Sequence, residues 1–558
     1  MIFKIYILIV LIFCFSLKAQ DFDLPSERIE IEKKVVQSKK LYEIGELNNN
    51  YKLSKMFENM TFEQIRKFYD SLPTNNTNSS IDKLVYEILR SQINLDKKSL
   101  NSKEDKKIFE IRINKLFEMG KFEDIDDFYS QIPIEVENEA LNVKRIEAYL
   151  LRNEFQNSCK LHQRLNDRKS FEWGKLEIIC SIIDQDFEKA RLSLSLLKEF
   201  GIPGDTLFID LAYKIIGDIE LSDEEIYDKK LRDLRTLTPI LLSSLQIAEI
   251  SPSFENIKDS PINYLIFILS SPSASIEVKL YCAERLVRLK RIKPEILADV
   301  YQLSNFSNEE IEKVFELYKT FSPVRSRALI YQSIIAEKDP KIKFKLIQLL
   351  LNQSKKENLF KPIAILLRNS LKYEDLKFTD EEGKELVVDI FLGNGEYIKA
   401  RNYIKQNKND NLLYMEHVLN LLKKIDQNFS ESVDYGELKD TSTLSSKLPK
   451  KFVENFLIVG LFYESGLNIA ELNFTKKYID QSVILTGELN LIDFIFLVDN
   501  KNQQKDLGFF KILFKLTNTR DIRDLSNIEV YAILKIFEYF ENELIFKEIS
   551  KDLLFSQL

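Results

Sequence analysis

The segments that decide the fold of this chain read Gly120-Lys-Phe122-Glu-Asp-Ile125, Asn153-Glu-Phe155-Gln-Asn-Ser158 and Gln185-Asp-Phe187-Glu-Lys-Ala190. Each has a turn residue first, an aromatic residue two positions later and a small or aliphatic residue five positions later. The segments begin 33 and 32 positions apart. A period of this length is typical of stacked helical hairpins. We therefore expect one helix to end and the next to begin at each segment.

Apolar residues between these turns recur at the spacing of one helix face. The stripes are clearest over residues 107–200 and comprise Phe109, Ile113 and Leu116; Val143, Ile146 and Leu150; and Trp173, Leu176, Cys180 and Ile183. Such stripes predict amphipathic helices. One hairpin cannot bury its stripe alone, so neighbouring hairpins must stack and share a core. The expected fold class is therefore all-α, an α-solenoid of helical hairpins.

The composition favours the same fold class. Of 558 residues only 14 are Gly and 13 are Pro, which leaves little material for β-hairpins or Gly-rich phosphate loops. The formal net charge is −7, and charged residues make up 30% of the chain. Because the basic residues are dispersed, the sequence shows no electrostatic footprint of a nucleic-acid partner.

The turn segments resemble those of the tetratricopeptide-like (TPR-like) repeat proteins, whose period is about 34 residues. A fourth segment, Gly395-Glu-Tyr397-Ile-Lys-Ala400, is the best single match to the pattern. The resemblance implies a superhelix in which the second helix of each hairpin buries an aromatic and a small residue. The expected repeat core comprises Gly120, Phe122, Phe155, Phe187, Ala190, Gly395, Tyr397 and Ala400.

The first 20 residues, MIFKIYILIVLIFCFSLKAQ, contain an apolar run from Ile5 to Leu17. A run of about 13 residues is typical of a signal peptide and is shorter than the ~20 residues of a membrane span. We expect the mature chain to begin at Gln20 or Asp21 and to be periplasmic or secreted. The alternative is an uncleaved N-terminal anchor. No later apolar run predicts a transmembrane span after signal removal.

Five segments are expected along the chain. A signal peptide (1–20) precedes an N-terminal segment of TPR-like helices (21–217). A second helical segment with looser spacing follows at 218–427. Residues 428–450 read NFSESVDYGELKDTSTLSSKLPK, which lacks an apolar period and indicates a polar linker or loop. A C-terminal helical block is expected at 451–558.

Few residues suggest catalytic or metal chemistry. The two histidines, His162 and His417, lie far apart in sequence, and no metal-binding, P-loop or dinucleotide motif is present. His162 lies on an apolar stripe and is expected to be a core residue. We therefore predict no catalytic residue, no cofactor and no metal site, and the chain is not expected to be an enzyme.

One motif supports a competing prediction. Tyr463-Glu464-Ser465-Gly466 resembles the segment around the catalytic acid of lytic transglycosylases, some of which carry a large helical superhelix. Where that family has a downstream Gly-Leu-Met-Gln segment, this chain has Leu-Asn-Phe-Thr-Lys-Lys. The alternative function is a peptidoglycan-associated superhelical protein or a lytic transglycosylase-like enzyme that uses Glu464.

After residues 1–20 the chain contains the cysteines Cys159, Cys180 and Cys282. The first two lie on consecutive predicted helices, about 6 Å out of level along the axis. Export to an oxidising compartment permits a disulfide between them. The alternative is that all three are small buried hydrophobic residues. Cys282 is unpaired in both cases.

Together these features predict an exported helical-repeat scaffold or adaptor without catalytic activity. Its partner is expected to be another protein of the cell envelope, bound through the concave surface of the superhelix. A third interpretation is a purely structural spacer with no single partner.

Overall fold

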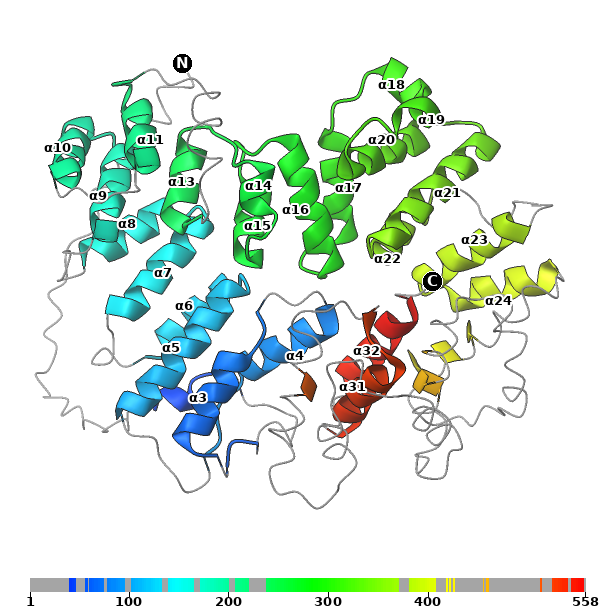
Figure 1. Ribbon diagram of the computed structural model, residues 1–558, viewed down its shortest axis with the longest axis horizontal. Helices are drawn as coiled ribbons and strands as arrows, with labels where there is room; N and C mark the ends of the chain where they lie inside the picture. The colour runs from blue at the N-terminus through cyan, green and yellow to red at the C-terminus, as the bar shows by residue number, and fades with distance from the viewer. Residues whose placement is uncertain are drawn as a thin grey trace, which may run out of the picture. The chain divides into compact units, whose positions relative to one another are not determined.

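Helices make up most of the chain that the structure describes (Figure 1). The computed structural model describes residues 40–46, 56–58, 60–74, 78–95, 102–132, 139–164, 171–199, 206–219, 237–370, 381–407, 418–419, 421–422, 425–426, 455, 458–460, 512–513, 524–539 and 543–555. The predictions for residues 1–20, His417, residues 428–450 and Glu464 lie outside these ranges. Within them there is no β-strand, and the all-α class is confirmed for this part of the chain.

The helices follow one another in chain order. The first set comprises η1 (Leu41–Glu43), α3 (Phe62–Ser71), α4 (Ser79–Arg90), α5 (Ser102–Glu118), α6 (Phe122–Ser130), α7 (Glu139–Leu151), α8 (Phe155–Gln163), α9 (Phe171–Ile183), α10 (Phe187–Glu199), α11 (Thr206–Ile216) and α13 (Pro239–Ile247). The second set comprises α14 (Phe254–Ile257), α15 (Ile262–Ser270), α16 (Ile276–Arg288), α17 (Pro294–Leu303), α18 (Asn308–Glu312), α19 (Val314–Leu317), α20 (Pro323–Ala336), α21 (Pro340–Lys356), α22 (Phe360–Leu367), α23 (Glu381–Gly393) and α24 (Tyr397–Gln406). The last two are α31 (Asn527–Tyr539) and α32 (Glu543–Phe555).

Five turns recur at a nearly constant distance in the first set. Left-handed backbone angles, with φ of 70°, 61°, 60°, 83° and 59°, occur at Gly120, Asn153, Gln185, Gly217 and Glu249. These residues lie 33, 32, 32 and 32 positions apart. The N–H of each donates to the carbonyl three residues earlier (3.0–3.1 Å), and the next N–H donates to the carbonyl five residues before it (2.8–3.0 Å). This Schellman arrangement satisfies the last carbonyls of a helix.

The sequence pattern identifies three of these five turns and misses two. Two positions after Gly217 and Glu249 the chain has Ile219 and Ser251, where the pattern requires an aromatic residue. A Schellman turn needs only a helix end and a residue that adopts positive φ. The aromatic residue is therefore not part of the turn itself.

Beyond residue 249 the same turn persists while its period is lost. Lys290, Asn358 and Gly395 have φ of 54°, 58° and 71°. Measured from Glu249, successive left-handed turns of this group lie 41, 68 and 37 residues apart. Helices of unequal length separate these turns. Helices of the second set therefore end in the same kind of turn as those of the first set, but at irregular intervals.

The second helix of each predicted hairpin begins at the aromatic residue of its segment. α6, α8, α10 and α24 start at Phe122, Phe155, Phe187 and Tyr397. The residue three positions later is fully buried in all four helices and is Ile125, Ser158, Ala190 or Ala400. This small or aliphatic position is therefore the consistent point of contact with the neighbouring helix.

The aromatic residues themselves are buried to different degrees. Phe122 is buried and packs on Phe117, with ring centroids 5.8 Å apart. Phe155 and Tyr397 are partly buried against the hydrophobic clusters. Phe187 is 38% exposed, so the expectation that it is largely buried is wrong. Phe187 is the first residue of α10, whereas the buried residues of that helix, Ala190, Leu194 and Leu197, lie further along it.

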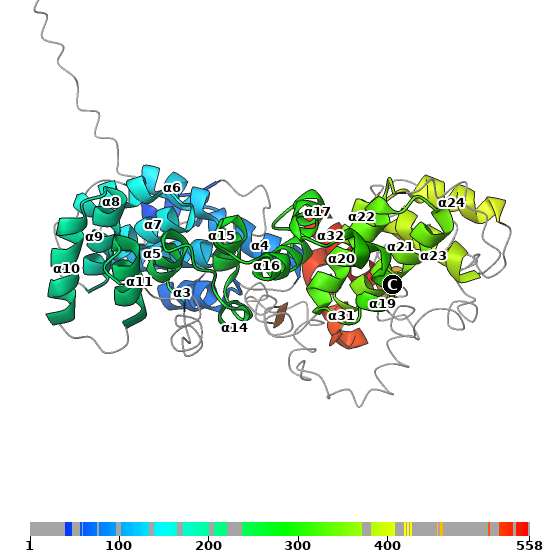
Figure 2. The same cartoon turned by 90° about the horizontal axis from the view of Figure 1, so that it is seen from above.

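Consecutive helices make most of the packing contacts, as in the pairs α7–α8, α9–α10 and α20–α21. Helices distant in sequence also meet: α13 packs on α7, α15 on α5 and α32 on α4 (Figure 1 and Figure 2). The buried apolar residues form one large cluster and a smaller one, which α7–α11 and α13 build. All these contacts lie within the compact unit Lys39–Leu558.

Candidate functional site

A disulfide joins two consecutive helices of the smaller cluster. Cys159 of α8 and Cys180 of α9 are bonded, with Cα atoms 5.7 Å apart, and both side chains are buried. The two residues therefore face one another across the hairpin despite the offset counted along the sequence. Cys282 of α16 is a buried free thiol, and burial raises its pKa to about 12. It is accordingly protonated at neutral pH.

His162 links three helices around this disulfide. Its side chain is buried, and its ring centroid lies 5.5 Å from that of Trp173. The His162 Nδ1 atom lies 3.4 Å from the carboxylate of Glu177 on α9, and Glu177 also forms an ion pair with Lys189 of α10. The histidine is a core residue, as expected, and its position ties α8 to α9 and, through Glu177, to α10.

α10 carries apolar residues on two opposite sides. Ala190, Leu194 and Leu197 are buried in the smaller cluster. Leu192 and Leu196 are 63% and 47% exposed. Residues four positions apart share one side of a helix, so these two leucines form one apolar surface away from the cluster. We name this pair the α10 outer face.

Ion pairs orient α10 beside its outer face. Arg191 pairs with Asp218, which follows α11, at 2.8 Å and with Glu188 of its own helix at 2.9 Å. Hydrogen bonds from Arg191 lower the pKa of the Asp218 carboxyl. Because these side chains are accessible to solvent, the pairs contribute orientation more than stability.

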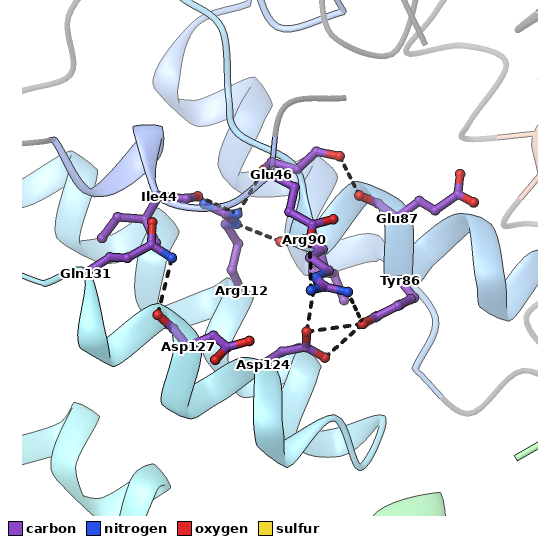
Figure 3. A network of polar contacts seen from close by, with 11 residues as sticks. Ile44, Glu46, Tyr86, Glu87, Arg90, Arg112, Asp124, Asp127 and Gln131 are labelled. Atoms are coloured by element: carbon purple, nitrogen blue, oxygen red, sulfur yellow. Dashed lines mark hydrogen bonds and ion pairs between the residues drawn. The ribbon is translucent and has the colours of Figure 1, made fainter. Parts of the chain in front are cut away.

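Buried charges that the sequence pattern does not reveal lie among the N-terminal helices (Figure 3). Arg112 of α5 is fully buried. Its Nε donates to the Leu89 carbonyl (3.0 Å), and its Nη2 donates to the carbonyls of Ile44 (2.9 Å) and Ser91 (2.8 Å). Arg112 thereby satisfies carbonyls at the end of α4, which a helix leaves without internal partners. Burial lowers the pKa of this guanidinium.

A second group in Figure 3 joins α4 to the start of α6. The Tyr86 hydroxyl donates to the Asp124 carboxylate (3.0 Å), and Arg90 Nε lies 3.1 Å from the same carboxylate. Arg90 also pairs with Glu46 at 2.7 Å. Burial, together with the Asp124 charge, raises the pKa of Tyr86 to about 12. The phenol is therefore a hydrogen-bond donor at neutral pH.

A third group lies in the second set of helices. Arg327 of α20 donates to both carboxylate oxygens of Glu284 on α16, from Nε at 2.7 Å and from Nη2 at 2.5 Å. The Tyr301 hydroxyl of α17 donates to the same carboxylate (2.8 Å). All three side chains are buried. Because both carboxylate oxygens are bonded, the group serves to hold three helices together.

The structure brings together few of the residues that the sequence singles out. It joins Cys159 to Cys180, whereas Gly120 and Gly395 end helices of separate hairpins. Among the described side chains, no three His, Cys, Asp or Glu residues converge as a metal site would require. No helix in the described ranges is long and apolar enough to cross a membrane.

The α10 outer face can be recognised in the sequence, although a search for one apolar stripe per helix does not find it. Residues 190–197 read ARLSLSLL. A single buried face needs only Ala190, Leu194 and Leu197, so Leu192 and Leu196 are in excess of what the hairpin can bury. Counting apolar residues on both sides of each helix would have found this surface.

No protein-family model, no curated protein and no solved structure matches the chain. The likeness to TPR-like repeats consequently rests on the residues of this chain alone, in its turns and in the small side chains that follow them.

Proposed function

We propose that this protein is a non-catalytic helical-repeat scaffold or adaptor that binds another protein. The observation that carries the proposal is the run of left-handed turns from Gly120 to Glu249 at spacings of 32 and 33 residues. Equal spacing gives successive hairpins equivalent exposed faces, and repeat proteins use such extended surfaces to bind partners. An α-solenoid arrangement of the hairpins is part of this proposal.

The proposal includes a site of action in the cell envelope. The apolar run within residues 1–20 supports export. A disulfide between Cys159 and Cys180 suits an oxidising compartment, because thiols inside cells are usually kept reduced. The partner is then another envelope protein.

The α10 outer face is the described surface that best fits a contact with that partner. Leu192 and Leu196 are exposed apolar neighbours on one helix. Adjoining exposed apolar residues mark interaction sites more often than scattered ones. Anchors at i and i+4 suit packing against the apolar side of another helix. The partner is therefore proposed to present an apolar helix, with the concave surface of the stacked hairpins as the wider contact area.

Cross-linked capture from the envelope fraction tests this function with three forms of the protein. These are the wild type, the double variant Leu192→Lys/Leu196→Lys, and Ile398→Lys, a matched control in which the altered residue is 79% exposed on α24. We expect one partner to be captured by the wild type and the control but not by the double variant. Thermal melts should be the same for all three, since the altered residues contribute little to the core.

Equal capture by all three forms would remove the α10 outer face from the proposal. The enzymatic alternative has its own test, in which the purified protein is incubated with cell-wall polymer. Release of soluble fragments that stops in the Glu464→Gln variant would overturn the scaffold function.

A further inference from the structure

Two exposed glutamates lie on the same side of α10 as its outer face. Glu188 lies four positions before Leu192, and Glu199 lies three positions after Leu196. Residues three or four positions apart share one side of a helix, so the two leucines and the two glutamates form one stripe. The side chain of Glu188 is 89% exposed, and Glu199 is exposed as well. We name Glu188 and Glu199 the acidic rim of the α10 outer face.

The three cations of α10 lie beside this stripe and contact other groups. Lys189 pairs with a carboxylate of α9, and Lys198 lies over an aromatic ring of α11 at 4.4 Å from its centroid. Arg191 donates from Nε (2.9 Å) and Nη2 (2.8 Å) to Asp218, and from Nη1 (2.9 Å) to Glu188. Arg191 is thus shared between two carboxylates. The charge that the stripe itself presents to solvent is therefore negative.

Carboxylates outnumber cations around α10. Asp184 and Asp186 precede the helix and are exposed. The six carboxylates of α10, of the turn before it and of the groups that its cations contact are Glu177, Asp184, Asp186, Glu188, Glu199 and Asp218. Against the three cations they give a formal net charge of −3. An acidic partner surface is repelled by such a charge.

The same charge argues against two other occupants of this surface. In a symmetric dimer each copy offers the same patch to the other, so a second copy of the chain would place acidic rim near acidic rim. An anionic lipid surface would be repelled in the same way. Charge complementarity therefore favours a partner that is basic where it surrounds the two leucines.

We propose that the α10 outer face binds a basic amphipathic helix. Leu192 and Leu196 contact apolar residues that the partner presents at i and i+4, and the acidic rim attracts Lys or Arg residues on either side of them. Glu188 and Glu199 are eleven positions apart, which is ~16 Å along α10 and sets the spacing of those basic residues. This inference rests on the proposed function, because it names the chemistry of the partner that the same surface binds.

Two synthetic peptides test the charge of the partner with the purified protein. Both are amphipathic and carry the same leucines at i and i+4; the polar positions are Lys in one peptide and Glu in the other. Each is about 20 residues long, since shorter isolated helices are marginal in water. Fluorescence anisotropy measures the two dissociation constants. At ~0.1 M sodium chloride the Lys peptide should bind at least about tenfold more tightly. At ~1 M, where the Debye length is about 3 Å, the two affinities should converge.

Reversal of the acidic rim should reverse this preference. We expect Glu188→Lys/Glu199→Lys to weaken binding of the Lys peptide about tenfold and to strengthen binding of the Glu peptide. The matched control is Glu255→Lys/Glu309→Lys, which changes the net charge equally at exposed positions of α14 and α18. It should alter neither affinity by more than about twofold. If circular dichroism shows that the rim reversal disturbs the fold, Glu188→Gln/Glu199→Gln should give a smaller loss in the same direction.

Equal affinities for the two peptides at ~0.1 M salt overturn the inference. Equal losses in the rim and control variants also overturn it, because the Lys peptide then responds to net charge alone. Leu192→Ser/Leu196→Ser removes the apolar side chains without a change of charge, and undiminished binding of the Lys peptide to this variant would place the contact elsewhere. Envelope capture that depends on the two leucines, combined with equal peptide affinities, would leave the proposed function standing and remove only the basic partner.

Discussion

The turns at residues 120–249 and those at residues 290–395 define helix boundaries in different ways. In the first region the helix ends recur at 32 or 33 residues, so the distance along the chain from one left-handed turn to the next is nearly constant. In the second region several helices are fixed at their starts, because α17, α20 and α21 begin with Pro294, Pro323 and Pro340. Proline is well suited to the first position of a helix and says nothing about where the helix ends. A repeat therefore depends on end signals at a constant distance.

The two regions also differ in the contacts that hold them together. In the first, the buried residues Ile125, Ser158 and Ala190 follow three of the five turns, and the disulfide joins α8 to α9. In the second, the buried group of Glu284, Tyr301 and Arg327 connects helices of unequal length. The variants below test whether regular turns and specific side-chain contacts are two separate ways to stabilise stacked helices.

The largest effect is expected from removal of the buried carboxylate in the second region. Glu284→Ala leaves the Arg327 guanidinium buried without its charged partner, and such a loss costs about 3–5 kcal/mol. Urea unfolding measures the change in the free energy of unfolding. Glu309→Ala, at an exposed site, serves as the control and should stay within about 0.5 kcal/mol. A loss below about 1 kcal/mol for Glu284→Ala would show that this ion pair does not hold the second region.

The next largest loss of stability is expected at Phe122, and a much smaller one at Phe187, although both residues occupy the same place in the sequence pattern. Phe122→Ala removes a buried ring and should cost about 3–5 kcal/mol. Phe187→Ala removes a ring that is already 38% exposed, so we expect a loss of about 1 kcal/mol. Thermal melts of the two variants compare them directly. Equal losses would mean that Phe187 is covered in solution.

Reduction of the disulfide should lower the free energy of unfolding by an amount close to that expected for Phe122→Ala. Only the first region should be affected. Cys159 and Cys180 are 21 positions apart, and closing a loop of this length adds about 3 kcal/mol by constraining the unfolded chain. Denaturant unfolding with and without reductant measures the difference. Thiol counting on denatured, non-reduced protein without residues 1–20 should find one reactive thiol, that of Cys282. Three thiols would rule out the bridge.

The smallest effect is expected when the glycine of one turn in each region is replaced by alanine. Gly120 and Gly395 have nearly equal φ, 70° and 71°, so alanine should cost about 1–2 kcal/mol at either position. A Cβ at Gly120 would also lie 2.7 Å from Cδ1 of Ile266 on α15, whereas nothing lies within 4 Å at Gly395. We expect Gly120→Ala to lower the free energy of unfolding more than Gly395→Ala. The reverse order would show that α15 does not approach the turn at Gly120.

Helix ends and starts could be predicted from sequence because their signals are local. The segments that begin at Gly120, Asn153, Gln185 and Gly395 correctly locate four left-handed turns and the first residue of the next helix. The turn at Glu249 was missed, since a helix end can place almost any residue in this conformation when the following bonds compensate for the strain. Exposure of the ring at Phe187 depends on neighbouring helices, which a local pattern does not specify.

The polar groups could not be predicted in the same way. The partners in the Glu284 group are up to 43 positions apart, and Ser80, at the start of α4, donates a hydrogen bond to Asp552 on α32, 472 positions away. With 87 acidic and 80 basic residues in the chain, many pairings are equally compatible with the sequence. Only packing of the helices selects among them. The α10 outer face differs, because both of its leucines lie in one short helical stretch.

The contact between α4 and α32 also sets an order of events during synthesis. Ser80 leaves the ribosome 472 residues before Asp552, which at ~5–20 residues per second is an interval of roughly 25–95 s. Hairpins such as that of α9 and α10 need only a few tens of residues, so their contacts do not depend on the end of the chain. The side of α4 that α32 covers must wait for the end of the chain, and over this interval its apolar residues are open to premature association.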